Sequence, residues 1–434
     1  MKCDFWVRVA PAFAALVAAS DPALAQTSAP AAPQTTPAPA ASTPPAAPAA
    51  PATWQSTINV GLQLDGGIMF NPAAPSDGIN FGHLFTDRAN QLVLNQALLT
   101  VARPIDPKAD HVDLGFQFQF LYGTDARYTH FLGELDYVAT TTNYQMDVVA
   151  ANIQAHVPYI TSGGIDLTVG QYPTLLGYET IDPSTNPFYS HSYIFNFGLP
   201  FKHTGGYAIA HVNPMLDLYI GGDSGTNTTI AGGDNNSAPG AMGGFKITAM
   251  GGNLTVLGLT HIGPENPSSV VPGADGFMRA YNDIVIGYKY SDALNFTTEL
   301  NWVRDAYGFV GTPVNGFGAA QYVAYTLTKT LTLNARAEVF RDDNGFFVAG
   351  FTNPLAPVKV LGGVPTSGVV SFGAGTYGEL TLGVTYKPTV PGPIQNLMVR
   401  PEIRWDHAFT DNHPYNSGKD SNAVTLGSDL LIAF

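Results

Sequence analysis

The sequence predicts an all-β protein, a transmembrane antiparallel up-and-down β-barrel of about 16 strands. Three observations predict this fold. Segments in which apolar and polar residues alternate with a period of two recur along most of the chain. The connections between these segments alternate between short turns and long loops. Outside the N-terminus there is no run of 18 or more apolar residues, which argues against membrane-spanning helices.

The N-terminal segment, residues 1–25, is predicted to be a secretory signal peptide. Lys2 and Arg8 provide a positively charged start, and an apolar stretch follows from about Val9 to Ala19. Ala23-Leu24-Ala25 then forms a small-residue cleavage site. The apolar stretch is shorter than a membrane anchor requires, which favours a cleaved signal.

The rest of the chain is predicted to have two parts. Residues 26–52 consist almost entirely of Ala, Pro, Ser, Thr and Gln, so they are predicted to form a disordered periplasmic linker. A tether to the cell wall is the alternative role for this linker. Residues 53–434 are predicted to form the outer-membrane β-barrel. Cys3, the only cysteine, would leave with the signal, so the mature chain is expected to lack thiol and disulfide chemistry.

Sixteen segments have the length and alternation of barrel strands. The last one shows the pattern clearly, because Thr425 and Asp429 alternate with apolar residues that continue to the terminal Phe434. One face of such a strand meets lipid and the other meets water. Phe434 is therefore predicted to be the signal that the barrel-assembly machinery recognises. The predicted strands are 54–70, 88–103, 111–122, 145–156, 164–172, 203–212, 215–222, 240–250, 253–262, 279–290, 293–304, 317–328, 331–341, 370–387, 396–409 and 423–434.

The connections favour an outer-membrane barrel over a soluble β-sandwich. Short turns such as Gly251-Gly252 and Ser291-Asp292 alternate with long segments rich in Gly, Asn, Asp and Pro. Short turns at the periplasmic rim and long loops at the outer rim are typical of outer-membrane barrels. The predicted long loops are 71–87, 123–144, 173–202, 223–239, 263–278, 305–316, 342–369 and 410–422.

Charged side chains are predicted to line the lumen. In segment 396–409 the charged residues alternate with apolar ones, and an Arg facing lipid at mid-depth would cost about 2–4 kcal/mol. The charged residues must therefore face inward. The predicted inward-facing residues are Arg336, Glu338, Glu379, Lys387, Arg400, Glu402, Arg404 and Asp406. They could select solutes, form ion pairs that stiffen the wall, or do both.

The longest predicted loop, 173–202, contains more aromatic residues than a solvent-facing loop needs. Folding this loop into the barrel mouth would bury them and narrow the channel. Glu179 and Asp182 would then oppose the arginine wall across a constriction, and the resulting field would screen solutes by charge. Packing of the loop over the rim, or against a neighbouring subunit, is the alternative.

A barrel of 16 strands is too wide for side chains to fill, so a water-filled channel is expected. The predicted function is passive diffusion of small hydrophilic solutes or ions across the outer membrane of a Gram-negative bacterium. The formal net charge of −14 lies in the barrel and its loops, which predicts a mild cation preference. The expected partners are outer-membrane lipid, lipopolysaccharide, the solutes, the barrel-assembly machinery and, in a homotrimer, two further copies of the chain. No nucleic acid is expected.

Several stretches of the sequence resemble the OmpL-like outer-membrane β-barrel porin-2 family. These stretches are Val169–Glu179, Asn186–Tyr193, Pro200–Gly205 and Val399–Asp406. The resemblance covers the chain from about residue 54 to residue 434 and implies a porin. The solute that the protein transports and its oligomeric state do not follow from membership of the family. His191 stands where relatives are expected to carry Arg, and the inward folding of loop 173–202 is an analogy with general porins.

Motifs that could indicate an enzyme have simpler interpretations. The glycines at 373, 375 and 378 match a dinucleotide-binding pattern, but no helix is expected after them. Ser224 in Gly222-Asp-Ser-Gly225 lacks an evident His and Asp partner set. The histidines show no pair at metal-ligand spacing, so no metal, cofactor or catalytic residue is predicted. The alternatives to a porin are a barrel enzyme of the lipase or protease type and a non-conducting structural or adhesive barrel.

Overall fold

A computed structural model of the protein describes residues 53–136, 138, 142–308 and 311–434. The predicted signal peptide and the whole of the predicted linker lie outside these residues. Within the described part, no helix is long and apolar enough to cross a membrane. The described residues form one compact unit.

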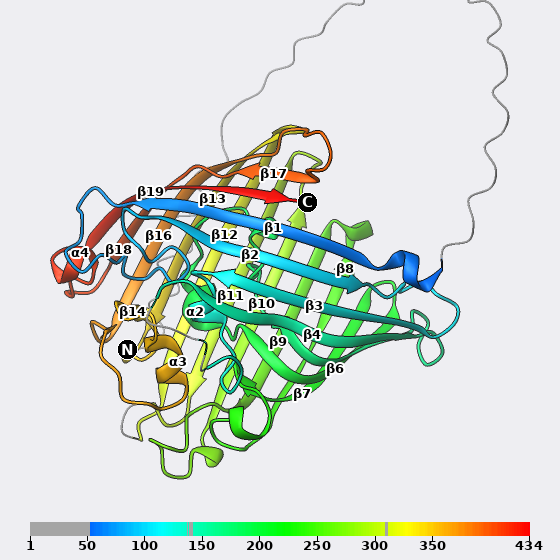
Figure 1. The fold of residues 1–434 in the computed structure, drawn as a ribbon, viewed down its shortest axis with the longest axis horizontal. Helices are drawn as coiled ribbons and strands as arrows, with labels where there is room; N and C mark the ends of the chain where they lie inside the picture. Colours follow the sequence, from blue (N-terminus) through cyan, green and yellow to red (C-terminus); the bar gives the residue numbers. More distant parts are fainter. Residues whose placement is uncertain (1–52, 137, 139–141, 309–310) are drawn as a thin grey trace, which may run out of the picture. The chain divides into compact units, whose positions relative to one another are not determined.

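One antiparallel sheet forms the body of this unit and closes on itself (Figure 1). Each strand pairs with the next one in sequence, and the last strand pairs with the first, Leu64 lying opposite Ile432. The segments of the sheet are β1 (Asn59–Phe70), β2 (Leu92–Arg103), β3 (Asp113–Gly123), β4 (Gln145–Val157), β5 (Ile165–Pro173), β6 (Lys202–Asn213), β7 (Leu216–Thr226), β8 (Gly240–Ala249), β9 (Leu254–Pro264), β10 (Met278–Lys289), β11 (Leu294–Asp305), β12 (Val314–Thr328), β13 (Leu331–Asp342), β16 (Gly375–Tyr386), β17 (Asn396–Val399), β18 (Glu402–Ala408) and β19 (Asn422–Ala433).

The predicted sixteen-stranded antiparallel barrel is confirmed. The sheet has 17 segments, but β17 and β18 both lie between β16 and β19 and form one strand interrupted at Arg400 and Pro401. A proline lacks the N–H that a strand ladder needs, which explains the interruption. The long and short connections also alternate as predicted, with β6 and β7 joined by a short turn and β5 and β6 by a long loop.

Three strands begin four or five residues later than predicted. β2 begins at Leu92 rather than at residue 88, and residues Trp54–Thr57 form a short helical turn before β1. β16 begins at Gly375, because Val369–Val370 (β15) pairs with Gly350–Phe351 (β14) in a separate two-stranded sheet. The short helices are η3 (Trp54–Thr57), α2 (Ala126–Thr129), η4 (Pro183–Thr185), η5 (Ile194–Gly198), η6 (Ala231–Gly233), η7 (Met250–Gly252), η8 (Ala274–Gly276), α3 (Ala356–Leu361) and α4 (Tyr415–Gly418).

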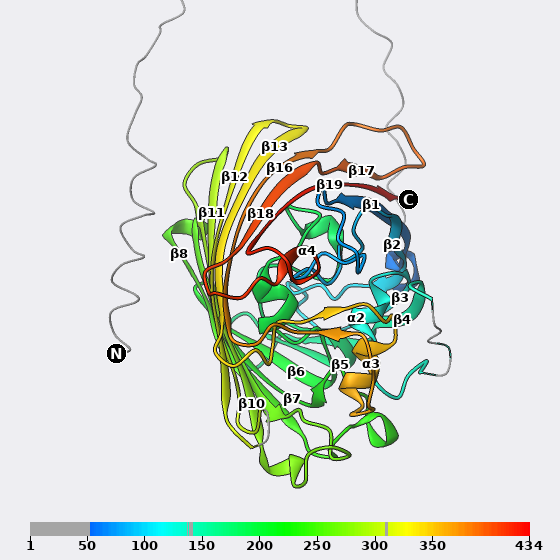
Figure 2. The same cartoon turned by 90° about the vertical axis from the view of Figure 1, so that its left-hand side faces the viewer.

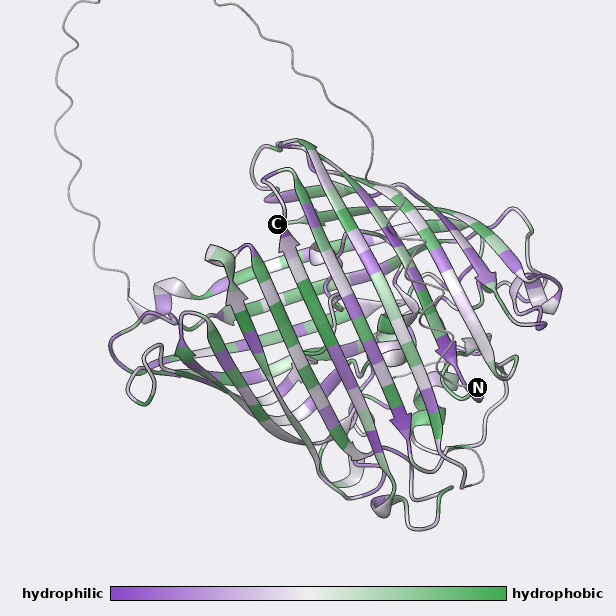
Figure 3. Ribbon diagram, turned by 180° about the vertical axis from the view of Figure 1, so that it is seen from behind, coloured by the Kyte–Doolittle hydropathy of each residue, from purple (hydrophilic) through white to green (hydrophobic). Residues whose placement is uncertain are grey.

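The two faces of the sheet have opposite character, as the alternation predicts. Leu382, Ile403 and Leu426 lie side by side on β16, β18 and β19, and each is about half exposed on the outer face. Arg404 and Thr425 lie side by side on the inner face and are buried. Figure 3 shows hydrophobic and hydrophilic residues alternating along the strands. The outer face is therefore suited to lipid and the inner face to water and polar loops.

This arrangement predicts a large cost for a charge on the outer face. We expect Leu382→Arg to destabilise the barrel folded in vesicles by about 2–4 kcal/mol, the cost of Arg near the bilayer midplane. Urea titration of the barrel in phospholipid vesicles measures it. Val360→Arg is the matched control, because Val360 is exposed in α3 outside the barrel strands and should tolerate the charge. Equal stability of both variants would contradict the assignment of the lipid face.

Candidate functional site

The loop between β5 and β6, residues 174–201, lies inside the ring of strands (Figure 2). Its central residues Tyr193, Ile194 and Phe195 are 0–4% exposed, although no regular strand or long helix holds them. The tip of the loop makes its own hydrogen bonds: the carboxylate of Asp182 accepts from the backbone N–H of Ser184 at 2.9 Å. The folding of this loop into the barrel, predicted from its aromatic residues, is thus present in the structure.

Arg336 on β13 joins the loop to the wall. Its Nη1 lies 2.7 Å from Oε1 of Glu179 in the loop, and its Nε lies 2.5 Å from Oε1 of Glu379 on β16. Nη1 also donates to the carbonyl oxygen of Ser190 at 2.9 Å. All three charged side chains are almost fully buried, so the guanidinium has exchanged water for two carboxylates and a loop carbonyl.

The electrostatics of Glu179 follow from these contacts. Burial by itself would raise the pKa of this carboxyl group. The positive charge of Arg336 and a hydrogen bond from His191 oppose that effect and bring the pKa down to about 2. Burial also lowers the pKa of His191, so its ring is neutral at pH 7. Glu179 therefore remains a carboxylate that pairs with Arg336 at neutral pH.

Glu338 holds the start of helix η5. Its two carboxylate oxygens accept from the backbone N–H groups of Tyr193 at 2.6 Å and Ile194 at 2.7 Å. The neighbouring strand β12 presents Gly318 to the same segment. A Cβ atom at this position would lie 2.3 Å from Cγ1 of Ile194, so only glycine allows the loop to come this close. The wall therefore provides both hydrogen-bond acceptors for the loop backbone and space for the side chain of Ile194.

β18 and its neighbours hold the remaining part of the loop. Glu402 accepts from the backbone N–H of Tyr189 at 2.9 Å. Arg404 Nη1 donates to the carbonyl oxygen of His191 at 2.6 Å, while its Nη2 pairs with Asp406 at 2.7 Å. Each of these wall residues therefore contacts the loop backbone or pairs with a charge of the wall.

Arg400 contacts the tip of the loop. It pairs with Asp429 on β19 and donates from Nη1 to the carbonyl oxygens of Pro183 at 2.7 Å and Asn186 at 2.8 Å. Asp182 does not face an arginine: it accepts from Nε2 of Gln63 on β1 at 2.9 Å.

The predicted inward-facing residues therefore lie close together, with one exception. Lys387 is exposed just after β16, and it lines a cavity of about 180 Å³ with Ser184 and Lys329. The others are 0–6% exposed beneath or beside the loop. Their predicted lining of the pore stays a prediction. Their observed contacts are ion pairs along the wall and hydrogen bonds to the loop.

A second inserted segment was not predicted from the sequence. The loop between β1 and β2 buries Phe81 and Phe85, and Phe85 packs against Phe195 with ring centroids 5.4 Å apart. Asp87 in this segment forms a two-point ion pair with Arg127 of α2, with N–O distances of 2.9 and 2.7 Å. The phenylalanines of this loop were the feature of the sequence that could have predicted its insertion into the barrel.

The far side of the ring carries polar residues that keep contact with water. Asp166 on β5 and Asp217 on β7 face the lumen, and their side chains are 17% and 21% exposed. His211 on β6 bridges them through its two ring nitrogens, at 3.1 and 2.8 Å. Lys246 on β8 lies opposite Asp217 and is half-buried.

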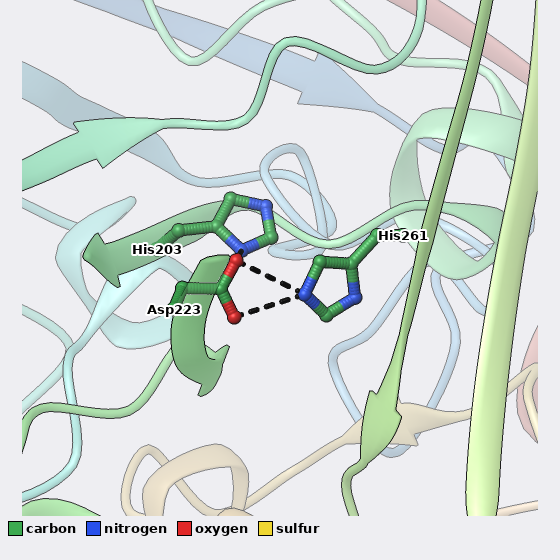
Figure 4. A group of neighbouring side chains, drawn as sticks. All are labelled: His203, Asp223 and His261. Carbon is green, nitrogen blue, oxygen red and sulfur yellow. Dashed lines mark hydrogen bonds and ion pairs between the residues drawn. The ribbon is translucent and has the colours of Figure 1, made fainter. Parts of the chain in front are cut away.

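Two histidines that are far apart in sequence lie together on the inner face. His203 on β6 and His261 on β9 both contact the carboxylate of Asp223 on β7 (Figure 4). Sequence spacing gave no sign of this group, because the barrel joins residues that local spacing separates. Ser224 beside Asp223 points elsewhere: its Oγ contacts the carbonyl oxygen of Thr228 at 3.2 Å.

The long-loop end of the barrel contains a larger cavity. It has a volume of about 390 Å³ and lies among inserted loops, β10 and α3. Apolar side chains such as Leu84, Phe201 and Val271 form much of its lining, with Arg279 and Glu265 as charged members. A closed ring of strands with an apolar outer face, a polar inner face and an inserted loop defines an outer-membrane β-barrel channel.

Comparison with known families agrees with this class. Residues 57–434 match the family described as "Putative beta-barrel porin-2, OmpL-like". The chain belongs to this family of outer-membrane porins, and its function is passive diffusion through the barrel. A search of curated proteins by sequence found no match.

Solved structures of outer-membrane channels share the fold. The channel DcaP of Acinetobacter baumannii has 13% sequence identity and a TM-score of 0.51, covering 87% of this chain and 97% of its own. An anion-selective porin from Comamonas acidovorans has 7% identity and a TM-score of 0.56, with 87% and 99% covered. OmpF of Salmonella typhi, solved with daunomycin, has 9% identity and a TM-score of 0.53, with 87% and 97% covered.

Proposed function

We propose that the channel prefers small cations. Arg336, Arg400 and Arg404 are buried and contact carboxylates, so they offer little positive charge to passing ions. Across the ring, Asp166 and Asp217 remain partly exposed to the lumen. The observation that carries this proposal is the burial of the arginines beneath the inserted loop while these acidic groups, which His211 bridges, stay partly exposed. Fixed negative charge at a water-filled passage concentrates cations.

The reversal potential in a salt gradient tests this preference. We expect planar-bilayer recordings in a KCl gradient to show a modest excess of K⁺ over Cl⁻ permeability. The double variant Asp166→Asn with Asp217→Asn should move the reversal potential toward zero. Asp292→Asn is the matched control, because it removes one carboxylate from a fully exposed side chain at a short turn. A Cl⁻ preference of the unaltered protein would refute the proposal.

We further propose that the predicted lining residues act by positioning the loop. Arg336, Glu338, Glu379, Arg400, Glu402, Arg404 and Asp406 form ion pairs and hydrogen bonds that fix the loop, and Glu179 and Asp182 are the loop's own anchoring carboxylates. The fixed loop narrows the lumen and thereby limits the size of the solutes. In this proposal the charged wall residues affect which solutes pass mainly by holding the loop in place.

We propose that this barrel is not an enzyme. The contacts that support this are those of Ser224, whose hydroxyl group contacts Thr204 and Thr228 and has no histidine partner among the described contacts. A serine nucleophile needs a histidine within hydrogen-bond reach. Conductance of the refolded protein, together with assays on lipid and peptide substrates, separates a channel from a barrel hydrolase or a non-conducting barrel.

The partners predicted from the sequence remain proposals. The apolar outer face would contact outer-membrane lipid and lipopolysaccharide. Phe434, which ends the chain beside β1 and donates from its N–H to Leu62, would be the residue that the barrel-assembly machinery recognises. A homotrimer would form through the outer face, and the mass of the detergent-solubilised, refolded protein would distinguish it from a monomer.

A further inference from the structure

His203, Asp223 and His261 place three metal-ligating side chains around one point (Figure 4). Nδ1 of His203 lies 3.1 Å from Oδ2 of Asp223, and Nε2 of His261 lies 3.0 Å from Oδ1. One ligand atom from each residue lies within 4.8 Å of the other two. All three side chains are fully buried. Among the described residues, this is the one group of three such side chains with this geometry.

The outer nitrogen of each histidine faces an oxygen atom. His203 Nε2 lies within hydrogen-bond distance, 3.2 Å, of Oγ1 of Thr174, whereas His261 Nδ1 lies 3.7 Å from Oε1 of Glu265 and makes no hydrogen bond among the described contacts. Glu265 is itself held by the backbone N–H of Thr226 at 2.9 Å. Histidines that bind metals usually donate a hydrogen bond from their second nitrogen to an oxygen atom, which leaves the first nitrogen free to donate its lone pair. The contact of His203 with Thr174 is of this kind.

Hydrogen bonding alone accounts poorly for His203. Its Nδ1 is buried and makes no hydrogen bond among the described contacts, although Asp223 Oδ2 is only 3.1 Å away. A buried nitrogen without a partner is unusual in a folded protein. Ligands at tetrahedral bond lengths to zinc lie about 3.3 Å apart, and their lone pairs point at the ion rather than at each other. The 3.1 Å between Nδ1 of His203 and Oδ2 of Asp223 is close to this separation.

We propose that His203, Asp223 and His261 bind one divalent transition-metal ion. Two imidazole nitrogens and one carboxylate oxygen suit Zn²⁺, which commonly takes three such protein ligands. The ion would link β6, β7 and β9 on the inner face. His203 directly follows Lys202, where the inserted loop joins β6, so the ion would also fix one end of that loop.

Metal content of refolded protein tests the proposal. Because the site is fully buried, Zn²⁺ is supplied during refolding in detergent, and excess ion is then removed by chelator and gel filtration. We expect one Zn²⁺ per chain by elemental analysis and a higher temperature of thermal unfolding than for protein refolded with chelator. Refolding with Co²⁺ should give visible d–d absorption that added Zn²⁺ abolishes when it is present in the refolding mixture.

Variants locate the ion. Asp223→Asn and His261→Gln should each lose the bound Zn²⁺, whereas His211→Gln should keep it. His211 is the matched control, since it also pairs with carboxylates on β5 and β7, but its two nitrogens bond to different ones.

Heat-dependent gel mobility shows whether each variant has folded. If the Asp223 and His261 variants do not fold, the stoichiometry and the Co²⁺ spectrum of the unaltered protein decide the matter. Less than one tightly held ion per chain, retention of the ion in folded Asp223→Asn, or its loss from folded His211→Gln would overturn the proposal and leave a hydrogen-bonded cluster.

Discussion

Replacing Arg336 with methionine is expected to destabilise the barrel by about 3–5 kcal/mol, the usual cost of removing one partner from a buried ion pair. Methionine fills similar space but leaves Glu179 and Glu379 without the guanidinium that they share. Glu179 then keeps hydrogen bonds to His191 and to the hydroxyl group of Tyr322, but no charged partner among its described contacts, because burial lowers the pKa of His191 and keeps its ring neutral. The loop should therefore leave the wall more often.

Two measurements separate the loss of stability from the movement of the loop. Urea titration in vesicles reports the loss of stability, and single-channel recording should show a larger and noisier current as the loop moves. Arg341→Met on the same strand is the matched control. Arg341 pairs with Asp343 at 3.0 Å, but both side chains are more than a third exposed, so this pair should be worth roughly 0–1 kcal/mol. Similar stability and current in the two variants would show that the Arg336 ion pairs do not hold the loop.

The wall of the barrel could be predicted from the sequence because alternation is a local property. Within each strand the alternation of apolar and polar residues shows which side chains meet lipid. The inward direction of Arg404 and Asp406 therefore follows from their apolar neighbours. The loop 173–202 could also be placed inside, because its aromatic residues need burial. The pairing of Glu179 with Arg336 could not be derived, since it depends on how far the loop descends before it meets β13.

Contacts between strands that are far apart in the chain could not be predicted from the sequence, for a related physical reason. His203 and Asp223 are 20 residues apart, and Asp223 and His261 are 38 apart, so no spacing rule joins them. Their meeting depends on the register of four consecutive strands from β6 to β9. A shift of one residue in any pairing would turn one of these side chains to the lipid face.

Replacing residues 179–195 with a short Gly–Ser linker is expected to increase the conductance severalfold. The deletion removes the buried rings and backbone that fill the lumen between the two sides of the wall. The barrel should still fold, because each exposed arginine keeps a carboxylate on the wall itself: Arg336 keeps Glu379, Arg404 keeps Asp406 and Arg400 keeps Asp429. Heat-dependent gel mobility and circular dichroism verify the fold before the recording.

The same deletion should also weaken the cation preference, because it opens three guanidinium groups to water while removing the negative charges of Glu179 and Asp182. The two effects have one cause, the position of the loop, so they should occur together. Replacing the exposed turn 364–367 with a Gly–Ser linker is the matched control and should change neither quantity. An unchanged conductance after removal of 179–195 would mean that ions pass along another route, and the loop would then be a structural support of the wall without control over passage.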